Sequence, residues 1–252
     1  MCLIVFAWCA HPGHPFILAA NRDEFHRRPA SPLQWWPDRP QIAAGRDLQA
    51  GGTWLAASRS GRFATVANYR ETLAAQPGER SRGALVTDFV TGSLGPLAFA
   101  ASIDGERYAG FSLLTATPEA VAYASNRSDA PRLLASGVYG LSNAALDTPW
   151  PKVVKSRQRL RALVDQDAVT FATLFDLLAD REPAGAADAS DQDLPPEMAR
   201  AVSAPFVVTP EYGTRCSTVF LLGVGGEAEL SERRFDATGR MIGNTSVKFR
   251  LH

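Results

Sequence analysis

The opening of the chain, residues 2–25 with the sequence CLIVFAWCAHPGHPFILAANRDEF, decides the fold class. Residues 2–9 form a continuous apolar run rich in β-branched and aromatic side chains, and residues 16–20 form a second run. The HPGHP segment between them has the proline and glycine content of a turn. Short apolar runs bounded by such a turn are typical of buried strands, so the sequence predicts a buried hairpin.

The remaining elements follow from the same reading of apolar periodicity. We expect a loop rich in Arg and Pro at residues 21–39. Further strands are predicted at 54–58, 62–69, 108–115, 120–125, 138–141, 215–222, 228–235 and 246–251. Helices are predicted at 81–90, 96–103, 150–164 and 170–178. In the helix at 150–164, Val153, Leu160, Leu163 and Val164 share the apolar face while Arg and Lys occupy the other face.

The order of these elements is strands, helices, strands, helices, strands, which predicts an α+β fold with helices packed on mainly antiparallel sheets. We expect a single domain over residues 1–252. Residues 182–197 contain five acidic residues, no basic residue and three prolines, which indicates a flexible acidic surface loop. Gly223–Ala228 matches a G-x-G-x-x-A pattern, but too little chain follows it for a dinucleotide-binding unit, so we interpret it as a turn.

Composition excludes several classes of protein. Hydrophobic residues make up 46% and charged residues 21%, which indicates a globular chain rather than a disordered one. The formal net charge of +0 provides no global attraction to nucleic acid or to an acidic membrane. The longest uncharged apolar run, residues 2–10, is too short to span a bilayer. The odd set of Cys2, Cys9 and Cys216 lacks CxxC spacing. We therefore expect a cytoplasmic protein without a bound metal, a nucleic-acid partner or stable membrane insertion.

Cys2 is the residue with the most informative chemistry. If Met1 is removed, the chain begins with a cysteine that carries both a thiol and a free α-amine. Such an amine has an ordinary pKa of about 7.7–8.0 and can accept the proton of its own thiol, as in N-terminal nucleophile catalysis. The alternative is that Cys2 simply begins a buried strand, because cysteine is among the most buried residue types.

A nucleophile of this kind needs an acid to orient the amine, a cation near the thiol and donors for an oxyanion. Polar residues at predicted strand ends supply candidates: Asn21–Glu24, Asn68–Arg70, Ser142–Asn143 and Arg215. As an alternative, these are ordinary turn residues and surface charges. The three histidines near the N-terminus, His11, His14 and His26, do not have the spacing of a metal site.

Several segments together resemble the NRDE family, which takes its name from Asn21–Glu24. They are MCLIVFAW, LAANRDEFHRRP, GRDLQAGGTW, VANYRE, YGLSNAALDTPWPK and TRCSTVFLL, and they span residues 1–222. The resemblance implies a four-layer αββα sandwich of the N-terminal nucleophile (Ntn) hydrolase type. The chain is also similar to cysteine amidases of the choloylglycine hydrolase and acid ceramidase type.

The likeness to these amidases implies roles for five residues. Cys2 corresponds to their nucleophile and Asp23 to the acid that orients the amine. Asn68 and Asn143 correspond to the two oxyanion donors, and Arg215 to a late arginine beside the nucleophile. The resemblance then implies a cysteine amidohydrolase that cleaves a linear carbon–nitrogen amide bond.

One position departs from the amidases. They carry an arginine three residues before the aspartate, and here that position is Ala20. Arg22 lies two residues further along on the same side of the strand, about 6.8 Å away, and is the candidate substitute. We expect Asn21, Arg22, Glu24 and His11 to take part in ligand binding.

The reported roles of the animal members of the family imply an alternative to catalysis: non-catalytic binding and trafficking of haem, lipid or acyl-CoA. No cofactor is required on either interpretation, and haem is possible as a carried ligand. Candidate haem contacts are Cys2, His11, His14, His26, Arg22, Arg27 and Arg28. A scaffold protein with a relict site is a third, weaker possibility, and the sequence leaves the oligomeric state and the substrate open.

Overall fold

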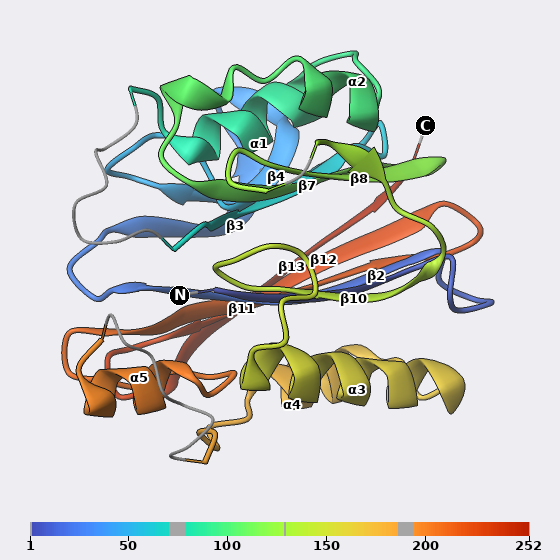
Figure 1. Ribbon diagram of the computed structural model, residues 1–252. Helices are drawn as coiled ribbons and strands as arrows, with labels where there is room; N and C mark the ends of the chain where they lie inside the picture. The colour runs from blue at the N-terminus through green and yellow to red at the C-terminus, as the bar shows by residue number, and fades with distance from the viewer. Residues whose placement is uncertain (1, 71–78, 129, 186–193, 252) are drawn as a thin grey trace.

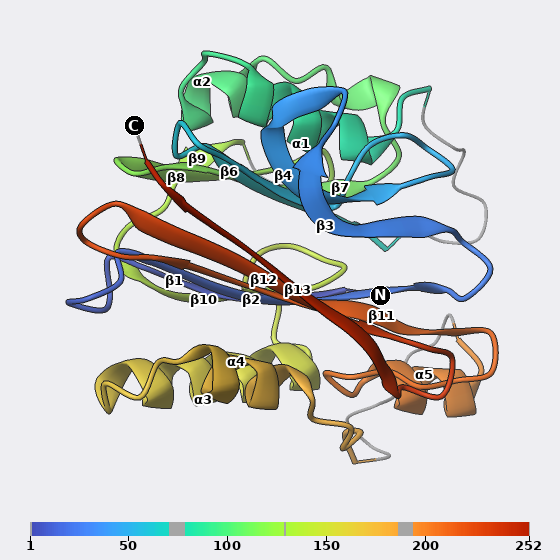
Figure 2. The ribbon, with the colours of Figure 1, turned by 180° about the vertical axis from the view of Figure 1, so that it is seen from behind.

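The computed structural model describes residues 2–70, 79–128, 130–185 and 194–251. These residues form four layers, in which two sheets pack face to face and helices cover the outer face of each (Figure 1; Figure 2). All strand pairs between named strands are antiparallel. The predicted α+β class and the four-layer αββα sandwich are therefore confirmed.

The first sheet has six strands, in the spatial order β10 (Gly137–Leu141), β1 (Leu3–Trp8), β2 (Phe16–Phe25), β11 (Tyr212–Leu222), β12 (Glu227–Phe235) and β13 (Met241–Arg250). The second sheet has seven, in the order β3 (Ala30–Trp36), β4 (Arg39–Asp47), β5 (Leu55–Ser58), β6 (Phe63–Asn68), β7 (Phe111–Thr117), β8 (Ala120–Ser125) and β9 (Arg132–Leu133). The helices are α1 (Arg82–Thr91), α2 (Pro96–Ala101), α3 (Pro151–Asp165), α4 (Phe171–Leu178) and α5 (Pro196–Val202), with a 3-10 turn at Gly105–Arg107. The α1 and α2 helices cover the second sheet, and α3, α4 and α5 lie on the side of the first (Figure 1).

The predicted N-terminal hairpin lies at the centre of the first sheet. Leu3 pairs with Asn21 and Trp8 with Phe16. All six residues of β1 are buried, because one face of the strand packs between the two sheets and the other packs on α3 and α4. Each large apolar side chain buried there contributes about 1.5–3 kcal/mol. A strand covered on both faces needs a continuous apolar run, which is what residues 3–8 supply.

Strand alternation then determines where the polar end of this hairpin points. The even-numbered residues Ile4 and Ala20 face the space between the sheets, and the odd-numbered residues Leu3 and Ala19 face the helices. Neighbouring residues of the NRDE segment consequently point to opposite faces of the sheet.

The predicted loop at 21–39 is wrong. The β2 strand continues through the NRDE segment to Phe25 because it pairs with β11 as far as Tyr212. Residues 30–36 then form β3, an edge strand whose pairing with β4 is interrupted between Ser31 and Gln34. Proline is tolerated on an edge strand and at such an irregularity, so the prolines of this segment gave a false loop signal.

The acidic stretch is only partly described. Residues 182–185 have no regular secondary structure, and residues 186–193 lie outside the described residues. The expected loop does not extend to 197, because α5 begins at Pro196. The glycines at 223–226 form a turn between β11 and β12, as predicted. No helix within the described ranges is both long and apolar enough to cross a membrane.

Candidate active site

Cys2 lies at the start of β1 and lines a cleft of about 250 Å³. The pairing of Leu3 with Asn21, carried one residue further, places Cys2 opposite Arg22. Both residues lie on the face between the two sheets, where they line the same cleft and a small adjoining void. Cys2 is therefore half-buried with Arg22 opposite it on the neighbouring strand, two residues beyond Ala20, which pairs with Ile4.

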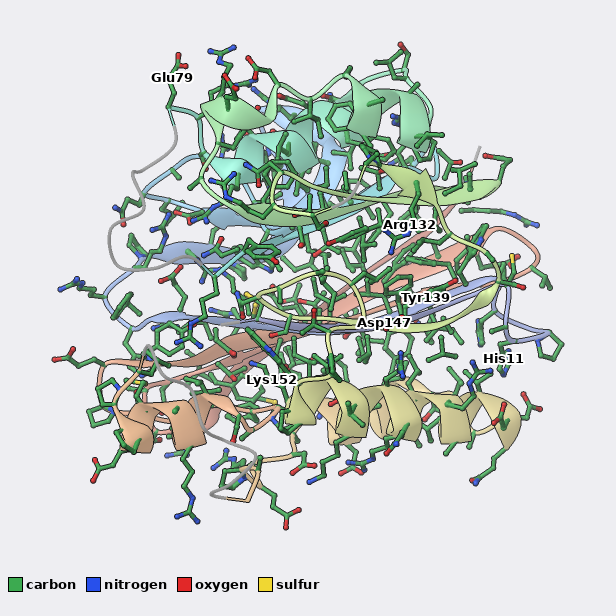
Figure 3. The ribbon with its side chains drawn as sticks, viewed as in Figure 1. His11, Glu79, Arg132, Tyr139, Asp147 and Lys152 are labelled. Atoms are coloured by element: carbon green, nitrogen blue, oxygen red, sulfur yellow. The ribbon has the colours of Figure 1, made fainter. Side chains whose placement is uncertain are left out.

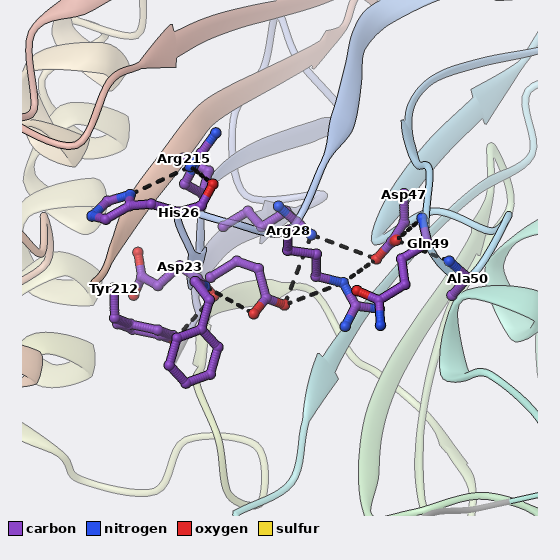
Figure 4. Close-up of polar contacts among 11 residues, drawn as sticks. Asp23, His26, Arg28, Asp47, Gln49, Ala50, Tyr212 and Arg215 are labelled. Atoms are coloured by element: carbon purple, nitrogen blue, oxygen red, sulfur yellow. Dashed lines mark hydrogen bonds and ion pairs between the residues drawn. The ribbon is translucent and has the colours of Figure 1, made fainter.

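The Arg22 guanidinium is held by an aromatic ring and two carboxylates. It lies 4.4 Å from the ring centroid of Trp54, 3.6 Å from Asp47 Oδ2 and 3.8 Å from Glu24 Oε2. Arg28 Nε donates to Asp47 Oδ2 at 2.7 Å and closes a network of two cations and two anions (Figure 4). These contacts orient Arg22 and make one wall of the cleft strongly polar.

Asp23 points to the opposite face of the sheet, towards the helices. Thr214 Oγ1 donates to its Oδ1 at 2.7 Å, and Tyr212 Oη donates to its backbone oxygen at 3.0 Å. Its other carboxylate oxygen, Oδ2, lies 4.0 Å from Lys152 Nζ and has no hydrogen-bond partner among the described atoms. Burial raises the pKa of Asp23, and the charges of Lys152 and Arg22 act against this shift.

Lys152 was not predicted as a site residue. The basic residues of the helix at 150–164 were expected on its solvent-facing side, but Lys152 is 2% exposed. Figure 3 labels it at the N-terminal end of α3, between helix and sheet. A signal was available: Lys152 precedes Ser156 and Leu160 by four and eight residues and so shares their buried stripe.

The two asparagines implied as oxyanion donors meet at one edge of the cleft. Asn143 Nδ2 donates to the backbone oxygen of Asn68 at 2.7 Å, and Ser142 Oγ donates to the backbone oxygen of Cys2 at 2.6 Å. Asn68 lines both the Cys2 cleft and a second, adjoining one of about 350 Å³. The second cleft is lined by Phe25, Asn68, Arg70, Asn143, Leu194, Met198, Val202 and Tyr212. The asparagines therefore lie where a polar cleft and a more apolar one join.

Asn21 is not directed into either cleft. Its Nδ2 donates to the backbone oxygens of Leu178 and Pro205, at 2.9 and 2.8 Å, and its Oδ1 accepts from Ser217 Oγ at 2.6 Å. The side chain is 1% exposed and joins the sheet to the end of α4. The structure thus gives Asn21 a connecting position rather than a ligand-facing one.

Two other predicted residues also lie away from Cys2. Arg215 donates to the backbone oxygen of His26 at 2.8 Å and contacts the ring of His26 (Figure 4). It is not among the described residues that line the two clefts. His11 lies at the turn of the β1–β2 hairpin, with its Nε2 2.9 Å from Asp167 Oδ1. The six residues of β1, which rise about 3.3 Å each, place it about 20 Å from Cys2.

The described residues include no group of three or more His, Cys, Asp or Glu side chains arranged to hold a metal. Of the other predicted haem contacts, His14 lies beside His11 at the far end of the hairpin, with the ring centroids 5.2 Å apart and the rings tilted by 32°. His26 is bonded through Nε2 to the backbone oxygen of Thr209 at 3.0 Å. Cys2, Arg22 and Arg28 line the cleft.

The polar cleft depends on a close approach of two glycines. A Cβ on Gly52 would lie 2.7 Å from the carbonyl carbon of Gly83, which is the second residue of α1. We expect Gly52→Ala to push α1 away from the cleft and to lower the free energy of unfolding by about 1–3 kcal/mol. The new methyl group would meet backbone atoms of Gly83, which cannot move aside as the end of a flexible side chain can. Urea unfolding measures this. Gly95→Ala, which meets nothing within 4 Å, is the control, and equal stability of the two variants would contradict the expectation.

A family model, described as TANGO2: Transport and Golgi organisation 2, matches residues 1–237. The chain belongs to this family. It is 33% identical to the mouse Transport and Golgi organization 2 homolog and 34% identical to the human one, with 92% of each chain covered in both comparisons. The Drosophila melanogaster Transport and Golgi organization protein 2 is 30% identical over 65% of each chain. The resemblance to the NRDE family is thus confirmed.

Solved structures similar to this member of the Transport and Golgi organisation 2 family confirm the Ntn hydrolase-like fold. The N-acylethanolamine-hydrolyzing acid amidase (NAAA) ortholog of Caenorhabditis elegans aligns with a TM-score of 0.51 at 10% identity, covering 87% of this chain and 92% of the other. The C2A mutant of the conjugated bile acid hydrolase of Clostridium perfringens aligns with a TM-score of 0.50 at 6% identity, covering 98% and 92%. At these identities the likeness concerns the fold alone.

Proposed function

We propose that this protein is a cysteine amidohydrolase that cleaves a linear carbon–nitrogen amide bond through Cys2. The observation that carries the proposal is the placement of the Cys2 thiol in a cleft opposite Arg22, with Asn68 on the same cleft wall. Removal of Met1 would leave Cys2 with a free amine beside Asp23. We also propose a cytoplasmic location, where the thiols stay reduced.

Each group has a role that its position supports. The Cys2 amine takes the thiol proton as Sγ attacks the amide carbon, and the Arg22 charge favours the thiolate. Asn68 and Asn143, whose Nδ2 donates to the backbone oxygen of Asn68, are the residues to which we assign stabilisation of the oxyanion. The proton then passes to the leaving nitrogen, and water hydrolyses the resulting thioester.

The two clefts suggest the shape of the substrate. The Cys2 cleft is lined by charged side chains, including Arg22, Glu24, Arg28 and Asp47. The adjoining cleft is walled by apolar side chains such as Met198 and Val202 of α5. We propose an amide with an apolar acyl group on the α5 side and a polar or charged amine part on the Arg22 side. N-acylglycines of increasing chain length are suitable probes.

The first test is the mass of the purified full-length protein before and after a short pulse of iodoacetamide at neutral pH. We expect loss of Met1 and one fast adduct, mapped to Cys2. Cys9 is exposed and is the internal reference for an accessible cysteine. Burial raises the pKa of the Cys216 thiol well above its usual range, so Cys216 is the reference for an unreactive one. Release of glycine from N-acylglycines should follow. A retained Met1, or a Cys2 no faster than Cys9, would contradict the proposal.

The second candidate function is non-catalytic carriage of haem, lipid or acyl-CoA. The observation that favours it is the junction of an apolar cleft with one that is lined by Cys2, Arg22 and Arg28. In such a complex the Cys2 thiolate would bind the haem iron, and the two arginines would pair with the acidic groups of the ligand. Haem titration would then give a saturable spectral shift that Cys2→Ala removes. A shift that does not saturate would exclude specific carriage.

A further inference from the structure

Lys152 and Asp23 form an unusual pair beneath the candidate nucleophile. The side chains of both are at most 1% exposed, and Lys152 Nζ lies 4.0 Å from Asp23 Oδ2. Neither atom has a hydrogen-bond partner among the described atoms. Buried polar atoms are normally bonded, so an unbonded donor and an unbonded acceptor directed at one place indicate a position for a third polar group.

The nitrogen end of Cys2 is the candidate for this third polar group. The β1–β2 register, extended by one pair, puts Cys2 opposite Arg22, the residue next to Asp23, and the charge of the Cys2 side chain acts to raise the pKa of Lys152. The bond from Ser142 Oγ to the backbone oxygen of Cys2, at 2.6 Å, holds the other end of the residue. Once Met1 is removed, the amine of Cys2 therefore has Asp23 and Lys152 within its reach.

We propose that Lys152 is a positioning residue which, together with Asp23, receives the α-amine of Cys2 and keeps that amine in its neutral form at neutral pH. The inference rests on the proposed function, in which that amine is free and acts as the base. Lys152 itself neither gains nor loses a proton during the reaction.

The physical reason is that one buried carboxylate balances one cation. Two cations, the Lys152 ammonium and a protonated Cys2 amine, would compete for Asp23 at close range, and like charges destabilise each other. Burial lowers the pKa of Lys152 and the Asp23 charge opposes this shift, while the ordinary pKa of a lysine, about 10.4, is well above that of an α-amine, about 7.7–8.0; the proposal therefore places the proton on Lys152. Asp23 then accepts a hydrogen bond from the neutral amine, whose lone pair can take the thiol proton.

The charged groups around the amine come from three segments. Asp23 and Arg22 belong to β2, Lys152 belongs to α3, and Arg70 follows β6 and acts on Lys152. Burial lowers the pKa of Lys152 and the Asp23 charge raises it again. Removing Lys152 should thus raise the pKa of the amine, and removing the Asp23 charge should lower it.

The experiment follows the α-amine directly in full-length protein from which Met1 has been lost, as verified by mass. Labelling with [15N]cysteine gives one amine signal, from Cys2, and amide signals from Cys9 and Cys216. Its chemical shift against pH gives the pKa. We expect a value at least one pH unit below the ordinary one, an increase of at least one unit in Lys152→Met, and a decrease in Asp23→Asn.

Lys155→Met is the matched control, because Lys155 lies on the same helix but pairs with Asp180 and Glu182 at the surface. It should leave the pKa of the amine unchanged. If Lys152→Met alone does not fold, the same comparison is made between Asp23→Asn and the double variant Asp23→Asn/Lys152→Met, in which no lone carboxylate is buried.

An amine pKa that is the same with and without Lys152 would overturn this proposal and leave the amidohydrolase proposal intact. A retained Met1 would overturn both, and the mass measurement separates that case from the first. Turnover of the N-acylglycine probe gives an independent reading: the lower pH limit of kcat/KM should move upward in Lys152→Met by the same amount as the pKa of the amine.

Discussion

Replacing Cys2 with alanine should lower the turnover of an N-acylglycine by about a thousand-fold or more, because the substitution removes the atom that attacks the amide carbon. The fold should persist. Cys2 lies at the end of β1 and is only half-buried, so loss of its thiol costs about 1 kcal/mol. Release of glycine and urea unfolding, measured on the same preparation, separate the loss of activity from any loss of stability.

Cys9→Ser is the control for this variant. Cys9 is exposed and lies just past the other end of β1, so its replacement should leave turnover unchanged within a factor of about two. Cys2→Ala with normal turnover would end the amidohydrolase proposal. That result would favour carriage of haem or lipid, in which Cys2 contacts the carried molecule and does not act as a nucleophile.

Replacing Asn21 with alanine should cause the largest loss of stability among the residues of the NRDE segment. The change leaves the backbone oxygens of Leu178 and Pro205 and the hydroxyl of Ser217 without their buried partner. Each unsatisfied buried group costs about 1–3 kcal/mol, which makes a total of about 3–5 kcal/mol reasonable. The midpoint of urea unfolding at constant m value measures this loss.

Asn244→Ala is the matched control, because Asn244 is an exposed asparagine on the edge strand β13. Its replacement should change the free energy of unfolding by no more than about 0.5 kcal/mol. An Asn21→Ala protein that is as stable as this control but inactive would mean that Asn21 contacts the ligand, as the sequence analysis predicted.

Much of the fold was predictable because the spacing of apolar residues along a segment indicates whether it forms a helix or a strand and which of its faces is buried. The run at 3–8 is apolar throughout and is buried on both faces. Thr170 is the N-cap of α4, and its side chain accepts a hydrogen bond from the backbone N–H of Thr173, as is typical of threonine at a helix start. The β3 and β4 strands were not predictable by the same method. β3 is an edge strand, which accepts proline and interrupted pairing, and β4 pairs with it through that irregular register, so this segment lacks the regular apolar alternation by which a central strand is predicted.

Some residues of the candidate site were also predictable from the sequence, and others were not. The family motifs placed Cys2, Asn68 and Asn143 at strand ends, and the structure brings these three to adjoining clefts. The positions of Arg215 and His11 were not predictable, because each depends on a partner far along the chain: His26 for Arg215 and Asp167 for His11.

Most helices and strands, and the family, could be predicted from the sequence alone, because apolar periodicity and a run of motifs are properties of neighbouring residues. Only the tertiary structure decided that Arg22 faces Cys2 between the sheets while Asp23 faces Lys152 beneath them. Strand alternation sends adjacent residues to opposite sides of the sheet, and whether a side chain meets the second sheet or a helix depends on packing between distant segments. Lys152 lies 129 positions after Asp23 in the printed sequence, so no local pattern could join them.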